Sequence, residues 1–277
     1  MKRSVCLLSF ILTAVLLAGC AGYARIKHAG QTGQASESTP IHENPFQIGE
    51  KLTYLITWNR LPVGTATTTV EKIMPFLDYE VYVVRVLAKS NDFLSRLFRI
   101  EDTFISYIDR KKLTSRHFEA IIKEGQYRKH LLVDYDFDKG IAFYHNLTDG
   151  SVKTCPIEKE VHDSVSAVYF ARTIPLKPGG NIELTVNVSE ENYRVYANIE
   201  KKVSLTLPEM GGFEAFLIKP YMMLDGKRQK RAKTSGYVSA DEKRIPLLII
   251  MRVLEIPWIG GVTATLRKIE KVAPAQD

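Results

Sequence analysis

The sequence is poor in the residues that build disulfide frameworks, metal centres and known catalytic motifs. Its 277 residues include three cysteines, two tryptophans and six histidines. It contains no G-x-S-x-G elbow, no H-E-x-x-H pair, no P-loop and no C-x-x-C pair. Three histidines (His117, His130 and His145) fall on successive expected strands, where solvated strand faces are the commoner explanation. We therefore expect a protein that is not an enzyme and uses no metal or cofactor.

Long hydrophobic runs are also missing, apart from one at the start of the chain. Residues 5–17 are apolar except for Ser9 and Thr13, and two basic residues precede them. A run this short falls below the roughly 20 residues that a spanning helix needs, so it is typical of a secretion signal. It ends in Leu-Ala-Gly-Cys20, which resembles the lipobox of bacterial lipoproteins. The resemblance implies a signal peptide over 1–19 and an acylated (palmitate-bearing) Cys20 that holds the protein on a lipid bilayer.

The residues after Cys20 have the composition of a tether. Residues 20–44 are rich in glycine, glutamine and serine and show little apolar periodicity. About 25 flexible residues span on the order of 27 Å. Ala21 follows the cysteine instead of the aspartate associated with inner-membrane retention, which favours an outer-membrane anchor facing the periplasm over an inner-membrane one. We expect the folded domain over 45–272 and a disordered tail over 273–277.

From residue 46 onward the apolar residues recur with a period of two. The run 181–188 is the clearest case, because Ile182, Leu184, Val186 and Val188 alternate with polar residues. Strict alternation indicates strands with one face on a core and the other in water, as in antiparallel sheets. Turn sequences such as Asp-Lys-Gly and Asp-Gly separate the runs. The sequence predicts an all-β, mainly antiparallel protein of ten to thirteen strands, without repeats.

Two segments depart from this pattern. Residues 163–174 begin at Asp163, a helix N-cap candidate, and predict a short apolar helix that packs on a sheet. Residues 90–99 place aromatic and leucine side chains at helical spacing, as core packing, as a lid over the sheet or as a lipid-facing patch. We expect a strongly curved sheet or incomplete β-barrel with one packed short helix. The alternative is two consecutive β-sandwich-like halves joined through that helix.

Three motifs resemble the bacterial domain-of-unknown-function family numbered 3108. The first is the opening stretch from Phe46, and the second surrounds the expected helix. The third begins at Tyr237, which occupies a position where a tryptophan is expected. The resemblance covers about residues 45–270 and implies an exported β-rich protein without an established activity. It carries over no catalytic residue, and structural roles account for the motif residues Gly49, Glu50, Trp58, Gly64, Asp163, Ser166, Tyr169, Asp241 and Arg244.

A basic run follows the Asp225-Gly226 turn and is a candidate contact for anionic surfaces. It contains Lys227, Arg228, Lys230, Arg231 and Lys233. In the periplasm the available anionic partners are lipid head groups or lipopolysaccharide phosphates, and nucleic acid is not expected. A solvated strand edge that blocks aggregation explains the same charges.

Three functions remain open at this stage. The first is non-enzymatic binding or assembly of a hydrophobic or envelope-derived ligand, such as a lipid or lipopolysaccharide. The second is a structural lipoprotein that binds an envelope protein partner through the basic run or residues 93–98. The third is an envelope-polymer hydrolase that uses Asp163, Asp241 or a histidine.

The expected lipid anchor is testable by replacing one atom. In the full-length chain, Cys20→Ser removes the thiol that receives the lipid, so the protein moves from the membrane fraction to the soluble fraction. At ~0.8 kcal/mol per buried CH₂, loss of two or more acyl chains abolishes stable anchoring. Mass spectrometry of the mature amino terminus provides the check, and an unacylated terminus in the wild type contradicts the expectation.

Overall fold

The computed structural model describes residues 44–229, 232–254 and 260–273. These residues form β-strands and two short helices, α2 (Asp92–Ser95) and α3 (Ser166–Ala171). The strands before α3 are β1 (Glu50–Trp58), β2 (Leu61–Phe76), β3 (Tyr79–Ser90), β4 (Glu101–Asp109), β5 (Ser115–Glu124), β6 (Tyr127–Asp136), β7 (Ile141–Asn146) and β8 (Val152–Pro156). Those after it are β9 (Asn181–Val188), β10 (Glu191–Leu207), β11 (Gly211–Leu224), β12 (Lys227–Arg228), β13 (Ala232–Ser239), β14 (Pro246–Val253) and β15 (Gly261–Lys271). The all-β prediction is confirmed.

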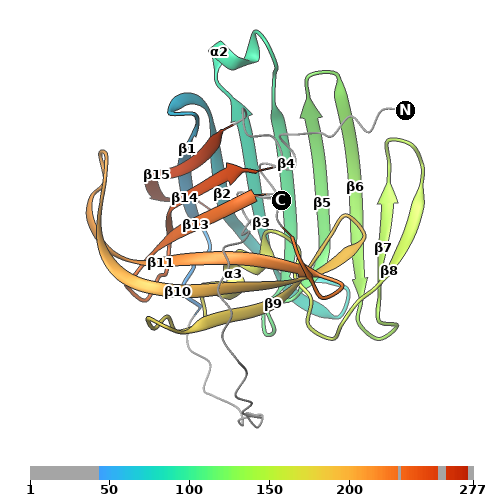
Figure 1. Ribbon diagram of the computed structural model, residues 1–277. Helices are drawn as coiled ribbons and strands as arrows, with labels where there is room; N and C mark the ends of the chain where they lie inside the picture. The colour runs from blue at the N-terminus through green and yellow to red at the C-terminus, as the bar shows by residue number, and fades with distance from the viewer. Residues whose placement is uncertain (1–43, 230–231, 255–259, 274–277) are drawn as a thin grey trace.

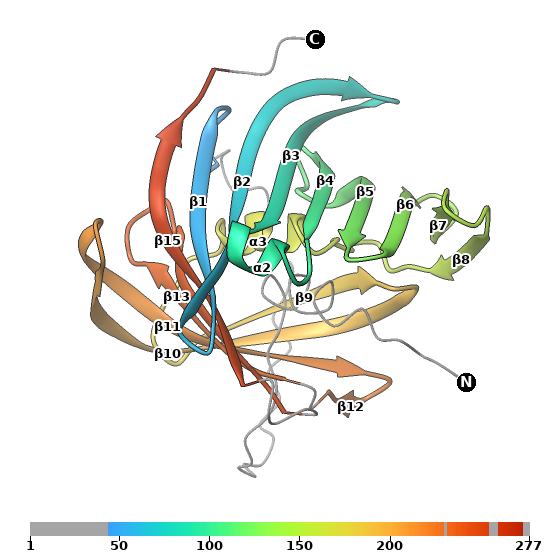
Figure 2. The same ribbon diagram turned by 90° about the horizontal axis from the view of Figure 1, so that it is seen from above.

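All the strands belong to one antiparallel sheet that curls without closing into a barrel. Its order is β8-β7-β6-β5-β4-β3-β2-β1-β15-β14-β13-β11-β10-β9, and β12 pairs with β11 outside this path. The first and last strands, β1 and β15, are therefore neighbours in the middle of the sheet. Figures 1 and 2 show the two arms of the sheet bending toward each other, with α3 between them. The curved-sheet prediction is confirmed, and the alternative of two separate halves is wrong because one hydrogen-bonded path joins all the strands.

The curl follows from twist and from interruptions in the strand register. Register shifts occur in β1 between Thr53 and Tyr54, in β2 between Val70 and Lys72, and in β10 between Ile199 and Lys201. An extra residue at such a point bends the strand and increases its right-handed twist. The alternating apolar residues of the central strands then face the inside of the curl, where they form the main core.

The glycines at two motif positions lie where no side chain fits. A Cβ on Gly64 would stand 2.2 Å from the carbonyl oxygen of Lys89 on the neighbouring strand. Gly49 has a φ of +84°, and its added Cβ would stand 2.2 Å from the carbonyl oxygen of Val272. Both positions therefore need glycine for close backbone contact.

The polar face of β9 differs from the expected solvent-exposed face. Thr185 and Asn187 alternate with apolar residues, yet both are buried. The curl brings the β7–β8 edge against them, so that the Tyr144 hydroxyl bonds Asn187 and the Asn192 side chain donates to the Pro156 carbonyl. Sequence alternation describes one strand and its two faces, and it cannot show that another part of the sheet covers the second face.

The segment that leads into α3 is anchored by a buried carboxylate. Asp163 Oδ1 accepts hydrogen bonds from the backbone N–H groups of Val165 and Ser166, at 2.7 and 2.9 Å. Its Oδ2 accepts from the hydroxyls of Ser106 on β4 and Ser115 on β5, at 2.5 and 2.7 Å. Asp163 is 1% exposed. It therefore caps the turn before the helix and fastens that turn to the sheet.

Both helices are shorter than the sequence pattern indicates. The expected helix over 163–174 is helical only over 166–171, because hydrogen bonds then shift to a tighter spacing at Thr173 and Ile174, just before Pro175. In the segment 90–99 only residues 92–95 are helical. No helix in the described ranges is long and apolar enough to span a membrane.

The buried carboxylate predicts a large stability effect. Asp163→Ala leaves two hydroxyls and two backbone N–H groups without their acceptor, and we expect a loss of about 3 kcal/mol in the free energy of unfolding. Asp163→Asn keeps one carbonyl acceptor, so its loss in the free energy of unfolding is smaller than that of Asp163→Ala. Urea denaturation measures both, with Asp138→Ala at an exposed turn as a control expected to change stability by less than about 0.5 kcal/mol. Equal effects of the two alanine variants contradict the assigned role.

Candidate functional site

Two apolar cavities lie beside α3, inside the curl of the sheet. Their volumes are about 50 and 150 Å³. They share four lining residues, Val168, Arg172, Pro246 and Ile249, so they meet along one side of the helix. Most of the lining side chains come from the core faces of strands, which is why the sequence gives no polar signal for this site.

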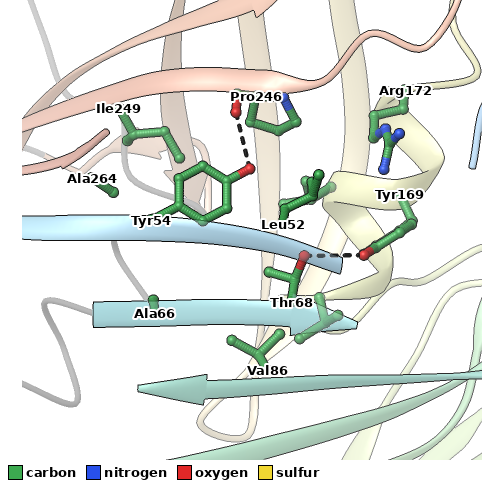
Figure 3. A pocket seen from close by; sticks show the side chains of 12 residues that line it. Leu52, Tyr54, Ala66, Thr68, Val86, Tyr169, Arg172, Pro246, Ile249 and Ala264 are labelled. Carbon is green, nitrogen blue, oxygen red and sulfur yellow. Dashed lines mark hydrogen bonds between the residues drawn. The ribbon is translucent and has the colours of Figure 1, made fainter. Parts of the chain in front are cut away.

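The smaller cavity lies between α3 and the central strands, and Figure 3 shows its lining. Two tyrosine hydroxyls are directed to fixed partners. Tyr54 donates to the Pro246 carbonyl at 2.9 Å, and Tyr169 donates to the Thr68 hydroxyl at 3.3 Å. Burial raises the pKa of Tyr169 to about 12, because the phenolate would lose its hydration. These hydroxyls thus stay neutral and act as structural hydrogen-bond donors.

Arg172 borders both cavities but its guanidinium is already bound. It makes a two-pronged ion pair with Glu50, at 2.6 and 2.9 Å, and donates to the carbonyls of Pro45 and Lys243. Burial disfavours its charged form, but the hydrogen bonds and attraction of Glu50 outweigh this and raise the pKa of Arg172. The positive charge is therefore neutralised inside the protein, and the cavities remain apolar around it.

The larger cavity is formed between α3 and the β9–β14 arm of the sheet. Its lining residues are Ala167, Val168, Ala171, Arg172, Leu176, Ile182, Leu184, Val195, Ala197, Ile218, Pro220, Thr234, Gly236, Tyr237, Val238, Arg244, Pro246 and Ile249. Three of these, Thr234, Gly236 and Val238, alternate along β13, so their side chains share the cavity face of that strand. From Thr234 to Val238 the strand extends about 13 Å at ~3.3 Å per residue. These residues of β13 thus line about 13 Å of the cavity wall.

Two polar groups in the larger cavity lack a full set of partners. The Thr234 hydroxyl oxygen is buried and has no hydrogen-bond partner in the described structure. Arg244, half-buried, uses Nη1 to donate to the carbonyls of Arg172 and Glu242. Its Nε and Nη2 have no bonded partner among the described residues. An unpaired buried hydroxyl is uncommon, and it is a place where a ligand group can bind.

The remaining motif residues have separate positions. Ser166 is buried and bonds Ser115, at 2.7 Å. Asp241 accepts from the Ser239 hydroxyl, and the Arg244 side chain donates to the backbone carbonyls of Arg172 and Glu242. Trp58 is 41% exposed at the end of β1.

The structure separates the residues of the basic run. Lys227 and Lys233 are exposed, whereas Arg228 is half-buried with its guanidinium 4.1 Å from the centre of the Tyr221 ring. Lys230, Arg231 and Cys20 lie outside the described residues. The described part of the run is therefore not one continuous cationic surface.

The groups considered for catalysis do not come together. His117 contacts Asp134 and His130 contacts Glu119, each at 2.6 Å. Burial lowers the pKa of His162 to about 4, and that ring stacks on Phe170. Among the described residues no group of three or more His, Cys, Asp or Glu side chains has the arrangement of a metal site.

One buried acid remains unexplained by these contacts. Asp102 on β4 is fully buried; its Oδ1 accepts from the backbone N–H of Lys123, and its Oδ2 has no hydrogen-bond partner. Burial, together with the neighbouring Glu124 carboxyl, raises the pKa of the Asp102 carboxyl to about 7, although the Lys123 N–H acts in the opposite direction. Both observations favour a protonated Asp102 in the folded protein.

This raised pKa predicts that the contribution of Asp102 to the stability of the protein is lost as pH rises. The folded state keeps the Asp102 proton up to about pH 7, whereas an unfolded aspartate releases it near pH 4. The stabilisation is complete below about pH 4 and is lost as the pH rises to about 7, with a slope of at most ~1.4 kcal/mol per pH unit. Urea unfolding across this pH range measures how the free energy of unfolding of the wild type differs from that of Asp102→Asn. If the two proteins show the same pH dependence, the raised pKa of Asp102 is contradicted.

Comparison with solved structures shows where this fold occurs. The chain is similar to a β-barrel-like protein of the DUF1849 family from Brucella abortus, with a TM-score of 0.53 and 8% identity, covering 80% of this chain and 97% of that one. At this identity the likeness shows a shared fold. A weaker match is a protein with a YmcC-like fold from Bacteroides fragilis, with a TM-score of 0.32, 12% identity, and coverage of 82% and 98%.

Sequence comparison gives the family. None of the curated proteins compared with the chain matches it. The model of the family described as "Protein of unknown function (DUF3108)" matches residues 53–267, which include the central and closing motifs and the part of the opening one from Thr53 onward. The chain therefore belongs to the DUF3108 family.

Proposed function

We propose that this protein is a non-enzymatic, lipid-anchored envelope protein that binds an acyl chain of an amphipathic ligand in the larger cavity. The single observation that supports this most directly is the lining of that cavity. The lining is almost entirely apolar, yet it includes the unpartnered Thr234 hydroxyl and the half-buried Arg244 guanidinium. An apolar chain with one polar or anionic end matches that combination.

The size of the cavity limits what can enter it. A cavity of about 150 Å³ holds a group of roughly the size of benzene, and pockets that enclose whole drug-sized ligands measure about 300–1,000 Å³. The cavity therefore suits a segment of a single acyl chain. Each CH₂ removed from water contributes ~0.8 kcal/mol, so a short segment already supplies useful affinity.

The location that we expect from the sequence supports a lipid as the ligand. A domain tethered at Cys20 to the outer membrane and facing the periplasm meets phospholipids and lipopolysaccharide at short range. Of the two other candidate functions, the hydrolase has the weaker support in the geometry. Asp163 already accepts four hydrogen bonds and is buried, which leaves it no access to a substrate.

Filling the cavity from its β13 wall is expected to abolish binding without unfolding the protein. A Cβ added to Gly236 meets no atom closer than the Ile218 carbonyl oxygen at 4.0 Å, so Gly236→Leu extends into open space on the cavity face. We expect at least about a tenfold loss of affinity for cis-parinaric acid, measured by fluorescence, since a side chain now occupies the site of several CH₂ groups. Ser235→Leu, one residue away on the opposite face, is the matched control.

The polar end of the ligand is tested in the same assay. Palmitate and hexadecanol share their chain and differ in head-group charge, and each displaces the probe. If Arg244 binds the head group, Arg244→Gln weakens palmitate more than hexadecanol, and Arg244→Lys restores palmitate binding. Absence of saturable probe binding by the wild type, or equal loss with Gly236→Leu and Ser235→Leu, contradicts the proposed function.

A further inference from the structure

Three adjacent connections form a single projection at one end of the sheet, which we call the α2 tip. It consists of residues 58–62, 90–100 and 124–128. The backbone N–H of Asn91 donates to the Val63 carbonyl at 2.8 Å, and its side chain donates to the Pro62 carbonyl at 2.8 Å. On the other side, the Gly125 N–H donates to the Arg99 carbonyl at 2.8 Å. Figure 1 shows α2 standing beyond the strand ends.

The tip exposes large apolar side chains to solvent. Leu61 is 62% exposed, Phe93 66% and Leu97 78%. None of the residues of α2 is buried, although Leu94 packs against the main core. Isolated exposed leucines are ordinary, but several on one projection mark a surface that contacts something else.

The exposure is built into the fold and is not the result of a loosely held loop. The Asn91 side chain accepts from the Leu94 N–H at 2.9 Å and caps α2, and the Ser90 and Ser95 hydroxyls bond at 2.6 Å. The ring of Phe98 lies over Gly125 so closely that a Cβ there would stand 2.6 Å from it. These contacts hold Phe93 and Leu97 outward in a defined arrangement.

The charge around these apolar groups is mainly positive. Arg60 and Arg96 are exposed and have no ion-pair partner among the described residues. Arg99 pairs with Glu101 at 3.0 Å, and Arg128 donates to two backbone carbonyls. The acidic residues of the tip are Asp92, which is exposed, and Glu124, which is buried, and Glu101 lies next to the tip. Free arginines interleaved with exposed apolar side chains are the pattern of a surface that binds at an anionic lipid–water interface.

We propose that the α2 tip docks on an anionic phospholipid bilayer, with Phe93 and Leu97 entering the interface and Arg60 and Arg96 binding lipid phosphates. The tip projects, so it suits a flat deformable surface. Its excess of positive charge opposes docking of a second copy through the same surface. This docking is independent of the acyl group at Cys20 and of the cavity ligand.

The test uses the chain from residue 20 onward carrying Cys20→Ser, so that neither the acyl anchor nor the apolar signal segment masks binding by the tip. Flotation with vesicles of phosphatidylethanolamine and phosphatidylglycerol is compared with vesicles of phosphatidylcholine alone. We expect binding to the anionic vesicles, a loss of about fivefold per arginine for Arg60→Gln and Arg96→Gln, and weaker binding at high salt. Phe93→Ser with Leu97→Ser is expected to reduce binding by at least about tenfold.

Leu77→Ser is the matched control, because Leu77 is an 84% exposed leucine in the β2–β3 turn, outside the tip. All five substitutions are at exposed positions, and circular dichroism verifies that each variant is folded. Failure of the parent chain to bind, equal binding to both vesicle types, or equal loss with Leu77→Ser overturns the proposal. The proposal is also overturned if the protein does not bind vesicles but self-associates, and Leu97→Ser abolishes that self-association. The tip is then a contact between copies of the chain.

Discussion

One short segment, residues 162–172, organises the inside of the curled sheet. It is hydrogen-bonded to both arms of the sheet. At its start, the N–H and carbonyl of His162 bond to Thr185 and Asn187 on β9. One residue later, Asp163 binds β4 and β5. At its end, Arg172 forms the buried ion pair with Glu50 on β1. A curled sheet with two free edges needs such a connection, because its strand ladder alone does not fix how far the arms close.

The same segment explains why the larger cavity exists. The side chains of α3 hydrogen-bond to β1, β2 and β5, through Glu50, Thr68 and Ser115. Toward β9 and β10 the helix has only apolar packing, with Ala167 against Val186 and Val195. The directional bonds therefore set the position of the helix against one arm. Space is left against the other arm, where apolar packing alone does not require close contact.

Much of the strand content could be predicted from the sequence, but the sheet order could not. The alternation over 181–188 matches β9, and Asp225-Gly226 is a turn as expected. Hairpins at Asn59-Arg60 and Ser189-Glu190 carry no glycine, although all four residues have positive φ, so no glycine marks these turns in the sequence. The pairing of β1 with β15 joins residues about two hundred positions apart, and periodicity contains no information on such partners. Similarly, the cavity depends on Ala197, Gly236 and Ile249, which look like ordinary strand residues until the helix is placed.

The central position of β1 and β15 has a kinetic consequence. Strands β1 to β8 form successive hairpins, so each can pair with the strand made just before it. The other edge of β1 stays uncovered until β15, ending at Lys271, has been made. Non-local pairing of this kind slows folding, and an uncovered apolar edge invites association between incomplete chains. A chain of this topology therefore spends the interval before its last strand arrives in its most aggregation-prone state.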